Sequence, residues 1–195
     1  HTSGNGQNQI VAARFDRTLA QQGNIVQLAA NVGDKPAPTL ASSADKLYLL
    51  HRGSDRKLRL GCFDAALQPV NAFGANGVVT VAVAARDESE RRPSLCMHGD
   101  EVALVWHQDG GDNLVLQRFN AGTGAAIDAN PIVLGAATET ASHPCVLHNG
   151  VQYAVVWVRQ EGDAYKVQMR FVSNAGAALD AAPHTLFQQN HPMFA

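Results

Sequence analysis

The chain has 195 residues and a formal net charge of −2, and 46% of its residues are hydrophobic, 16% charged and 6% aromatic. This composition is typical of a globular domain with enough apolar material for a core. The near-neutral charge and the lack of a Lys/Arg cluster exclude a nucleic-acid-binding surface, and no apolar run reaches the roughly 18 residues that would span a bilayer. The sequence therefore predicts neither a nucleic-acid partner nor a membrane span.

An internal repeat of about 50 residues organises the chain. Each repeat has a proline before a short apolar stretch, then an apolar run that ends in His or Trp, then an Arg-Phe or related pair. The proline landmarks are Pro38, Pro93, Pro144 and Pro192. The run-ending landmarks are His51, Trp106 and Trp157, and His1 falls at the same place. The pair landmarks are Arg14-Phe15, Cys62-Phe63, Arg118-Phe119 and Arg170-Phe171.

Four short strands can be read within one repeat. In the third repeat they are expected near 94–97, over 101–106, over 113–119 and near 131–134. Turns such as Asn149-Gly150 separate the strands, because these residues tolerate the positive φ of tight hairpins. Short meandering strands at this period predict an all-β fold, a β-propeller of about four four-stranded blades.

The landmarks predict a single β-propeller region over 1–195, which begins and ends within a repeat. If the four strands of a blade are lettered a to d in chain order, the expected segments are strands c and d of a blade over 1–34, whole blades over 35–90, 91–141 and 142–190, and strand a of another blade over 191–195. Three origins fit this pattern: part of a larger propeller, a strand supplied by a neighbour, or a four-blade ring closed by its ends. We favour the first, so the expected partners include the remainder of a larger propeller or a homo-oligomer.

One stretch resembles a known repeat family. An Arg-containing strand over 58–67 leads to a Phe-Gly-Ala-Asn-Gly-Val segment over 73–78, similar to the delta-sixty type repeats of bacterial propellers. The resemblance covers about twenty residues, and the other repeats keep only Arg-Phe and a Gly-Ala-Ala-(Ile/Leu)-Asp element. It implies a bacterial protein in an extracellular, periplasmic or cell-surface location, and it brings no catalytic residues.

The first candidate site lies where the repeat brings equivalent residues together. Arg92, His143 and His191 each stand directly before a landmark proline, so in a propeller they converge at the mouth of the central channel, with Lys35 nearby. Such a ring could bind an anion or, through its histidines, a metal. Alternatively, the His-Pro pairs only form the entry to a strand.

The second candidate site is a set of aromatic and basic residues at the ends of the apolar runs. Aromatic side chains next to hydrogen-bonding groups are typical of sugar-binding sites. Alternatively, the two tryptophans belong to the core between blades. The residues of this set are His1, His51, Arg52, Trp106, His107, Trp157 and Arg159.

Three cysteines and two further histidines complete the ionisable candidates. Cys62, Cys96 and Cys145 are all expected as small buried hydrophobic residues. A disulfide is possible between Cys96 and Cys145, which are expected on the inner strands of adjacent blades. His98 and His148 are expected as exposed turn residues on the face opposite the channel mouth. We predict no metal and no cofactor.

Neither a catalytic triad motif, a phosphate loop nor a facing pair of carboxylates appears in the sequence. The function predicted first is therefore a non-catalytic module that binds a protein or a glycan through the channel-mouth face. The alternatives are an exported enzyme, or enzyme subunit, with its site at the channel mouth, and a structural scaffold in a larger assembly.

Overall fold

The structure is a computed structural model, and it describes residues 8–33, 38–84, 92–108, 113–135 and 140–190. These residues form fourteen strands and two short 3-10 turns. The strands are β1 (Asn8–Phe15), β2 (Gln21–Val32), β3 (Thr39–Ser42), β4 (Lys46–Arg52), β5 (Lys57–Asp64), β6 (Val78–Ala84), β7 (Ser94–His98), β8 (Glu101–His107), β9 (Leu114–Asn120), β10 (Ile132–Gly135), β11 (Thr140–His148), β12 (Tyr153–Glu161), β13 (Ala164–Val172) and β14 (His184–Gln189). The 3-10 turns are Asn71–Phe73 and Ala75–Gly77. Neither turn approaches the length of a membrane-spanning helix, and no other helix occurs in the described residues.

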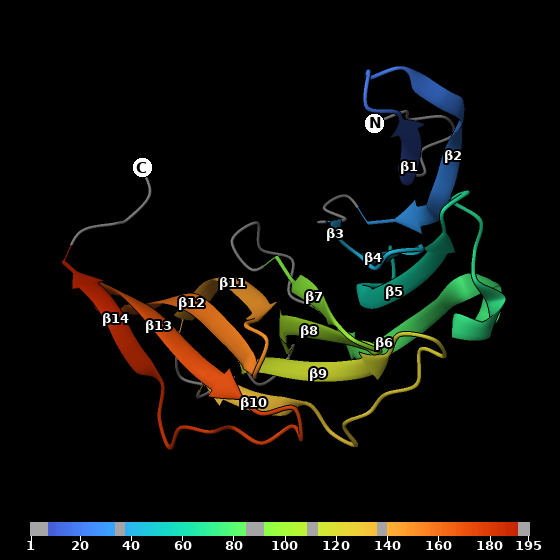
Figure 1. Ribbon diagram of the computed structural model, residues 1–195. Helices are drawn as coiled ribbons and strands as arrows, with labels where there is room; N and C mark the ends of the chain where they lie inside the picture. The colour runs from blue at the N-terminus through green and yellow to red at the C-terminus, as the bar shows by residue number, and fades with distance from the viewer. Residues whose placement is uncertain (1–7, 34–37, 85–91, 109–112, 136–139, 191–195) are drawn as a thin grey trace.

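The strands form one two-stranded sheet and three four-stranded sheets, each an antiparallel meander. The four-stranded sheets are β3–β6, β7–β10 and β11–β14, and β1 pairs with β2 alone. The sheets follow one another along an arc, with β3, β7 and β11 on its inner side (Figure 1). This arrangement of consecutive meanders confirms the predicted β-propeller fold. The four-stranded sheets fall within the predicted blade segments, except that β11 begins two residues before the predicted boundary at 142.

Alternation along each strand gives every blade two apolar faces. In β8, Val102, Leu104 and Trp106 pack towards the blade β3–β6, whereas Ala103 and Val105 pack towards β11–β14. Two cores result, one between each pair of neighbouring blades, as expected for sheets that are buried on both faces. The blades therefore stabilise one another rather than folding around separate cores.

The Arg-Phe pair, one of the three landmarks of the repeat, is displaced by one residue in the last blade. Arg118 lies opposite Ala103, whereas the residue opposite the equivalent Ala154 is Phe171, not Arg170. The same shift appears in the backbone hydrogen bonds. The N–H of Arg118 donates to Asp128 Oδ2 at 2.8 Å, and the N–H of Phe171 donates to Asp180 Oδ2 at 3.1 Å. The Asp of the repeated Gly-Ala-Ala element thus anchors strand c, while the Arg landmark does not keep a fixed position.

Candidate functional site

A groove lies at one end of the three inner strands. It has a volume of about 350 Å³, near the lower end of the range for small-molecule sites. The lining residues come from the starts of β3 and β7, from the residues directly before these strands, and from the irregular point in the middle of β11. They are Pro38, Thr39, Arg92, Pro93, Ser94, His143 and Pro144.

His143 lies at an irregular point of β11. The pairing of β11 with β12 shifts register between Ser142 and Cys145, and His143 has a φ of 51°. A non-glycine residue in this left-handed region is strained, and such strain and bulges occur preferentially at functional sites. The side chain is exposed, and Nδ1 lies 3.0 Å from Ser142 Oγ. The bulge thus directs an imidazole into the groove instead of keeping it in the ladder.

Arg92 reaches the same groove from the neighbouring blade. It directly precedes the buried Pro93, whose ring restricts Arg92 to extended backbone before β7 begins at Ser94. The N–H of Val146 donates to Ser94 Oγ at 3.2 Å, which ties β11 to β7 just behind the groove. Two blades are therefore held together where each contributes one basic side chain.

The structure brings together two of the predicted channel-mouth residues, Arg92 and His143. His191 and Lys35 lie outside the described residues. Among the residues that are described, no group of three or more His, Cys, Asp or Glu side chains could hold a metal ion.

The second predicted set does not form a surface platform. Trp106 and Trp157 are fully buried in the two inter-blade cores, so no ring face is available to a sugar. His51 and Arg52 are buried, and burial holds the pKa of His51 below its ordinary value. Arg159 is half-buried, with its Nη2 3.8 Å from Glu161 Oε1. The sugar-platform interpretation is therefore corrected: the tryptophans are core residues because they stand on faces that neighbouring blades cover.

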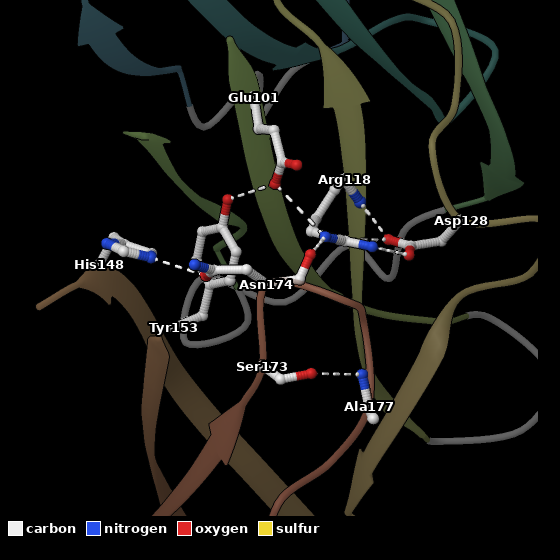
Figure 2. Close-up of polar contacts among 8 residues, drawn as sticks. All are labelled: Glu101, Arg118, Asp128, His148, Tyr153, Ser173, Asn174 and Ala177. Carbon is white, nitrogen blue, oxygen red and sulfur yellow. Dashed lines mark hydrogen bonds and ion pairs between the residues drawn. The ribbon is translucent and has the colours of Figure 1, made fainter. Parts of the chain in front are cut away.

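A polar cluster at the opposite end of the inner strands was not predicted (Figure 2). The guanidinium of the buried Arg118 pairs with Asp128 at 2.6 Å and with Glu101 at 3.4 Å. It also donates to the main-chain carbonyl of Asn174 in the next blade. Glu101 accepts a hydrogen bond from Tyr153 Oη at 2.7 Å, again across the blade junction. Arg118, Asp128 and Glu101 are all paired, and the contacts to Asn174 and Tyr153 join two blades.

A glycine permits this junction. Gly176 has a φ of 80°, and a Cβ there would collide with the side chains of Asp128 and Arg118. Sequence reasoning found the turn over 174–176 but not its contact with the preceding blade, because nothing local in the sequence pairs a turn with a strand more than fifty residues away.

His98 and His148 lie beside the same cluster. Their rings stack with centroids 3.3 Å apart and planes 12° from parallel, and both are half-buried. Our expectation of two exposed turn residues is therefore wrong. The N–H of Gly150 donates to His148 Nδ1 at 3.0 Å, and His148 Nε2 lies 2.9 Å from Asn174 Oδ1. A ring nitrogen that accepts from an N–H carries no proton, so these contacts define a neutral His148 that donates through Nε2.

The three cysteines are free thiols in the structure. Cys62 is buried, as predicted, whereas Cys96 is half-buried and Cys145 is exposed, so the prediction that all three are buried is wrong for Cys145. Burial, together with the nearby Cys145, raises the pKa of Cys96 to about 12. The possible bond between Cys96 and Cys145 is not formed.

No protein-family model and no curated protein matches the chain, whereas several solved structures resemble it. A family GH32 beta-fructofuranosidase of Bombyx mori in complex with sucrose is 11% identical, with a TM-score of 0.46 over 78% of this chain and 34% of that chain. A GH43B protein of the Bacteroides ovatus xyloglucan locus is 10% identical, with a TM-score of 0.49 over 77% and 30%. A thermostable family-43 glycoside hydrolase is 11% identical, with a TM-score of 0.43 over 75% and 54%.

The chain spans about a third of the first two proteins and about half of the third. At these identities no residue of the neighbours can be transferred to this chain. The proteins are nevertheless enzymes by name, against our first prediction of a non-catalytic binding module. That prediction is corrected, and the alternative of an enzyme or enzyme subunit is carried forward.

Proposed function

We propose that the chain is an exported enzyme, or the subunit of one, that performs proton-transfer chemistry on an anionic substrate in the groove between β3, β7 and β11. The observation that carries the proposal is the strained, exposed His143 in the same groove as Arg92. Strain at a groove-lining histidine has no role in packing, because His143 belongs to neither inter-blade core.

Arg92 would bind the anionic group. A guanidinium is always charged and offers parallel donors that match a carboxylate, sulfate or phosphate. Its position on the residue before Pro93 restricts the backbone from which it extends, which reduces the freedom lost on binding. An exposed arginine on such a restricted backbone is suited to orient a substrate.

His143 would transfer the proton. Imidazole is the side chain that both accepts and donates protons near neutral pH, and its ring nitrogens do so at separate positions. Ser142 Oγ lies 3.0 Å from Nδ1, so the hydroxyl helps to orient the ring at the edge of the groove. Arg92 on one blade and His143 on the next would then act on two parts of one molecule.

The residues that line the groove also favour one type of reaction over another. None of the described residues that line the groove is acidic, whereas the usual glycoside hydrolysis uses two carboxyl groups on either side of the scissile bond. We therefore place proton transfer at a carbon or oxygen near an anionic group ahead of that mechanism. The similarity to delta-sixty type repeats adds a bacterial source and export to the proposal.

Binding of an anionic and a neutral sugar tests the first half of the proposal. Glucuronate and glucose differ by a carboxylate, and we expect calorimetry to detect glucuronate alone. Arg92→Gln should weaken that binding about tenfold, the loss of roughly 1.4 kcal/mol expected for a charge-assisted hydrogen bond. The control Arg17→Gln removes an exposed arginine outside the groove lining and should bind normally. Equal binding of both sugars, or equal loss in both variants, would contradict the role of Arg92.

Measurement of turnover tests the second part of the proposal, proton transfer by His143. Purified chain is incubated with a panel of acidic oligosaccharides, and products are detected by mass spectrometry. His143→Gln should abolish turnover while glucuronate binding persists, since the amide cannot transfer a proton. Turnover that survives in His143→Gln would place the chemistry elsewhere.

A further inference from the structure

The hairpin between β11 and β12 contains an Asn-Gly pair, Asn149-Gly150. Both residues are exposed, and the main-chain N–H of Asn149 donates to the Gln152 carbonyl at 3.1 Å, which closes the turn. The side-chain carbonyl carbon of an asparagine can be attacked by the nitrogen of a following glycine, because glycine has no side chain to hinder the approach. This pair is therefore a candidate for chemical modification, and the groups around it decide how fast it reacts.

A histidine contacts the main-chain nitrogen that would react. The Gly150 N–H donates to His148 Nδ1 at 3.0 Å. His148 Nε2 lies 2.9 Å from Asn174 Oδ1, and this second contact keeps Nδ1 as the unprotonated ring nitrogen (Figure 2). An amide nitrogen attacks a carbonyl carbon only as it loses its proton, and imidazole is the side chain best suited to accept a proton near neutral pH. The contacts that orient the His148 ring thus also place a base on the nucleophile.

The side-chain carbonyl of Asn149 accepts two main-chain hydrogen bonds. The N–H groups of Val151 and Gln152 donate to its Oδ1 at 3.0 and 2.9 Å, so the side chain lies over the residues that follow it. Two N–H donors on one carbonyl oxygen stabilise the negative charge that develops there when the carbonyl carbon is attacked, as in an oxyanion hole. The hairpin therefore supplies both groups that the reaction needs, a base for the nucleophile and hydrogen-bond donors for the electrophile.

A second Asn-Gly pair in the described residues, Asn76-Gly77, has different surroundings. The Gly77 N–H donates to the main-chain carbonyl of Gly74 at 3.0 Å, and a carbonyl oxygen does not take up a proton near neutral pH. Gly77 is buried, and a Cβ there would stand 2.8 Å from Val70 N, whereas a Cβ at Gly150 would meet no atom within 4 Å. The same dipeptide thus occurs once in a crowded setting and once in an open one with a base beside it.

We propose that Asn149 is a site of self-catalysed deamidation in which His148 acts as the base. The Gly150 N–H proton passes to His148 Nδ1 as the nitrogen bonds to Asn149 Cγ, and negative charge develops on Oδ1. The imidazolium then gives the proton to the side-chain nitrogen, the Cγ–Nδ2 bond breaks and ammonia leaves. A solvent water opens the resulting succinimide at either carbonyl, which gives aspartate or isoaspartate. The chain thus gains one water and loses one ammonia, with no oxidant or reductant.

The modification would change a hairpin beside a blade junction. Either product has a carboxylate where the amide stood, and isoaspartate also adds one carbon to the main chain of the turn. The turn directly follows His148, whose ring stacks on His98 of the preceding blade. Deamidation would therefore alter the surroundings of a contact between two blades without cleaving the chain.

Peptide mapping of incubated protein tests the proposal. The folded chain is kept in neutral buffer and digested, and mass spectrometry quantifies the deamidated form of each Asn-Gly peptide. Asn149 should react at least about tenfold faster than Asn76, and His148→Gln should slow it at least about tenfold, since a positioned base contributes roughly 10²–10⁴-fold and solvent replaces part of this. The control His184→Gln changes an exposed histidine outside the hairpin and should leave the rate at Asn149 unchanged.

Two further measurements separate base catalysis from a structural effect of His148. Free imidazole should restore the rate in His148→Ala, because it replaces a missing base but not a missing packing contact. In urea the rates at Asn149 and Asn76 should become nearly equal, since the unfolded chain holds none of these groups in place. The proposal is overturned if Asn149 reacts no faster than Asn76 in the folded chain, if His148→Gln reacts as fast as wild type or faster, if imidazole restores nothing, or if urea leaves the ratio of the two rates unchanged.

Discussion

Strand β11 carries two histidines, His143 at its internal bulge and His148 at its last residue, and their environments are opposite. His148 stacks on His98, accepts a hydrogen bond from the Gly150 N–H and contacts Asn174 Oδ1, so these contacts hold its ring in one orientation. His143 sits exposed on a bulge with a φ of 51°. Residue type and spacing therefore do not separate a structural histidine from a functional candidate. Backbone conformation and the surrounding hydrogen bonds do.

The two ends of the inner strands also differ in how their residues affect the free energy of unfolding. The Arg118 cluster is a paired, buried network that joins two blades. The groove end contains backbone strain that the rest of the fold must offset, as is common at functional sites. Substitutions at the two ends should therefore separate stability from binding.

The largest expected effect is at the cluster. Arg118→Met leaves Asp128 and Glu101 without their buried partner, and removing one member of a buried ion pair costs about 3–5 kcal/mol. Urea unfolding measures this as a lower free energy of unfolding. Arg17→Met, at an exposed turn, serves as the control. A loss below about 1 kcal/mol, the value of a surface pair, would break the distinction between the two ends.

His148→Ala should destabilise the fold less, by about 0.5–1.5 kcal/mol, because it removes the hydrogen bonds to the exposed Gly150 and Asn174 and the stacking on His98. The same urea experiment measures it, with His184→Ala as the control on an exposed histidine. If His148→Ala were neutral, the stacked pair would not belong to the structural network.

A third histidine, His51, is neither a lining residue of the groove nor a member of the Arg118 cluster, and it predicts a pH dependence. Burial lowers its pKa in the folded state, so near its ordinary pKa the unfolded chain binds more protons than the folded one. The contribution of His51 is fully present above that ordinary pKa, and stability is lost as pH falls below it. The trend should appear in urea midpoints between pH 7.5 and 5.5, a window around the ordinary value of about 6.5.

The variant His51→Phe removes the titration and keeps a ring where the other blades have tryptophan. Its urea midpoint should fall less steeply over the same pH range. An unchanged slope would assign the acid sensitivity to other groups.

The smallest expected effect is at the groove. His143→Gly removes a side chain from a left-handed backbone position, where a non-glycine residue costs about 1–2 kcal/mol, while glycine raises the entropy of the unfolded chain. The two terms nearly cancel, so stability should stay within about 1 kcal/mol of wild type or rise slightly. A loss as large as that of Arg118→Met would show that His143 is a structural residue.

Much of the fold could be predicted because the same pattern of strands and turns recurs in each repeat. The prolines before β3 and β7 and within β11 located the groove, and Arg92 and His143 were found because equivalent positions of neighbouring blades converge. The strain at His143 could not be predicted, since it arises from a register shift in the pairing of β11 with β12.

Other features escaped because they depend on which face a neighbouring blade covers. The positions of Trp106 and Trp157 were predicted at the end of an apolar run, but burial is decided by the adjacent sheet. The Arg118 cluster joins residues from three segments, and the displaced landmark at Arg170 follows from a longer hairpin after Trp157 than after Trp106. One sequence contains no local signal for any of these.

The most direct test of the groove as the functional site is an NMR titration of the histidine C2–H signals with glucuronate, assigned by single His→Gln variants. We predict that the His143 signal shifts with glucuronate and not with glucose, that Arg92→Gln reduces the shift, and that the signals of His98 and His148 stay in place. A shift at His98 and His148 with none at His143 would contradict the account and place the ligand at the opposite end of the inner strands.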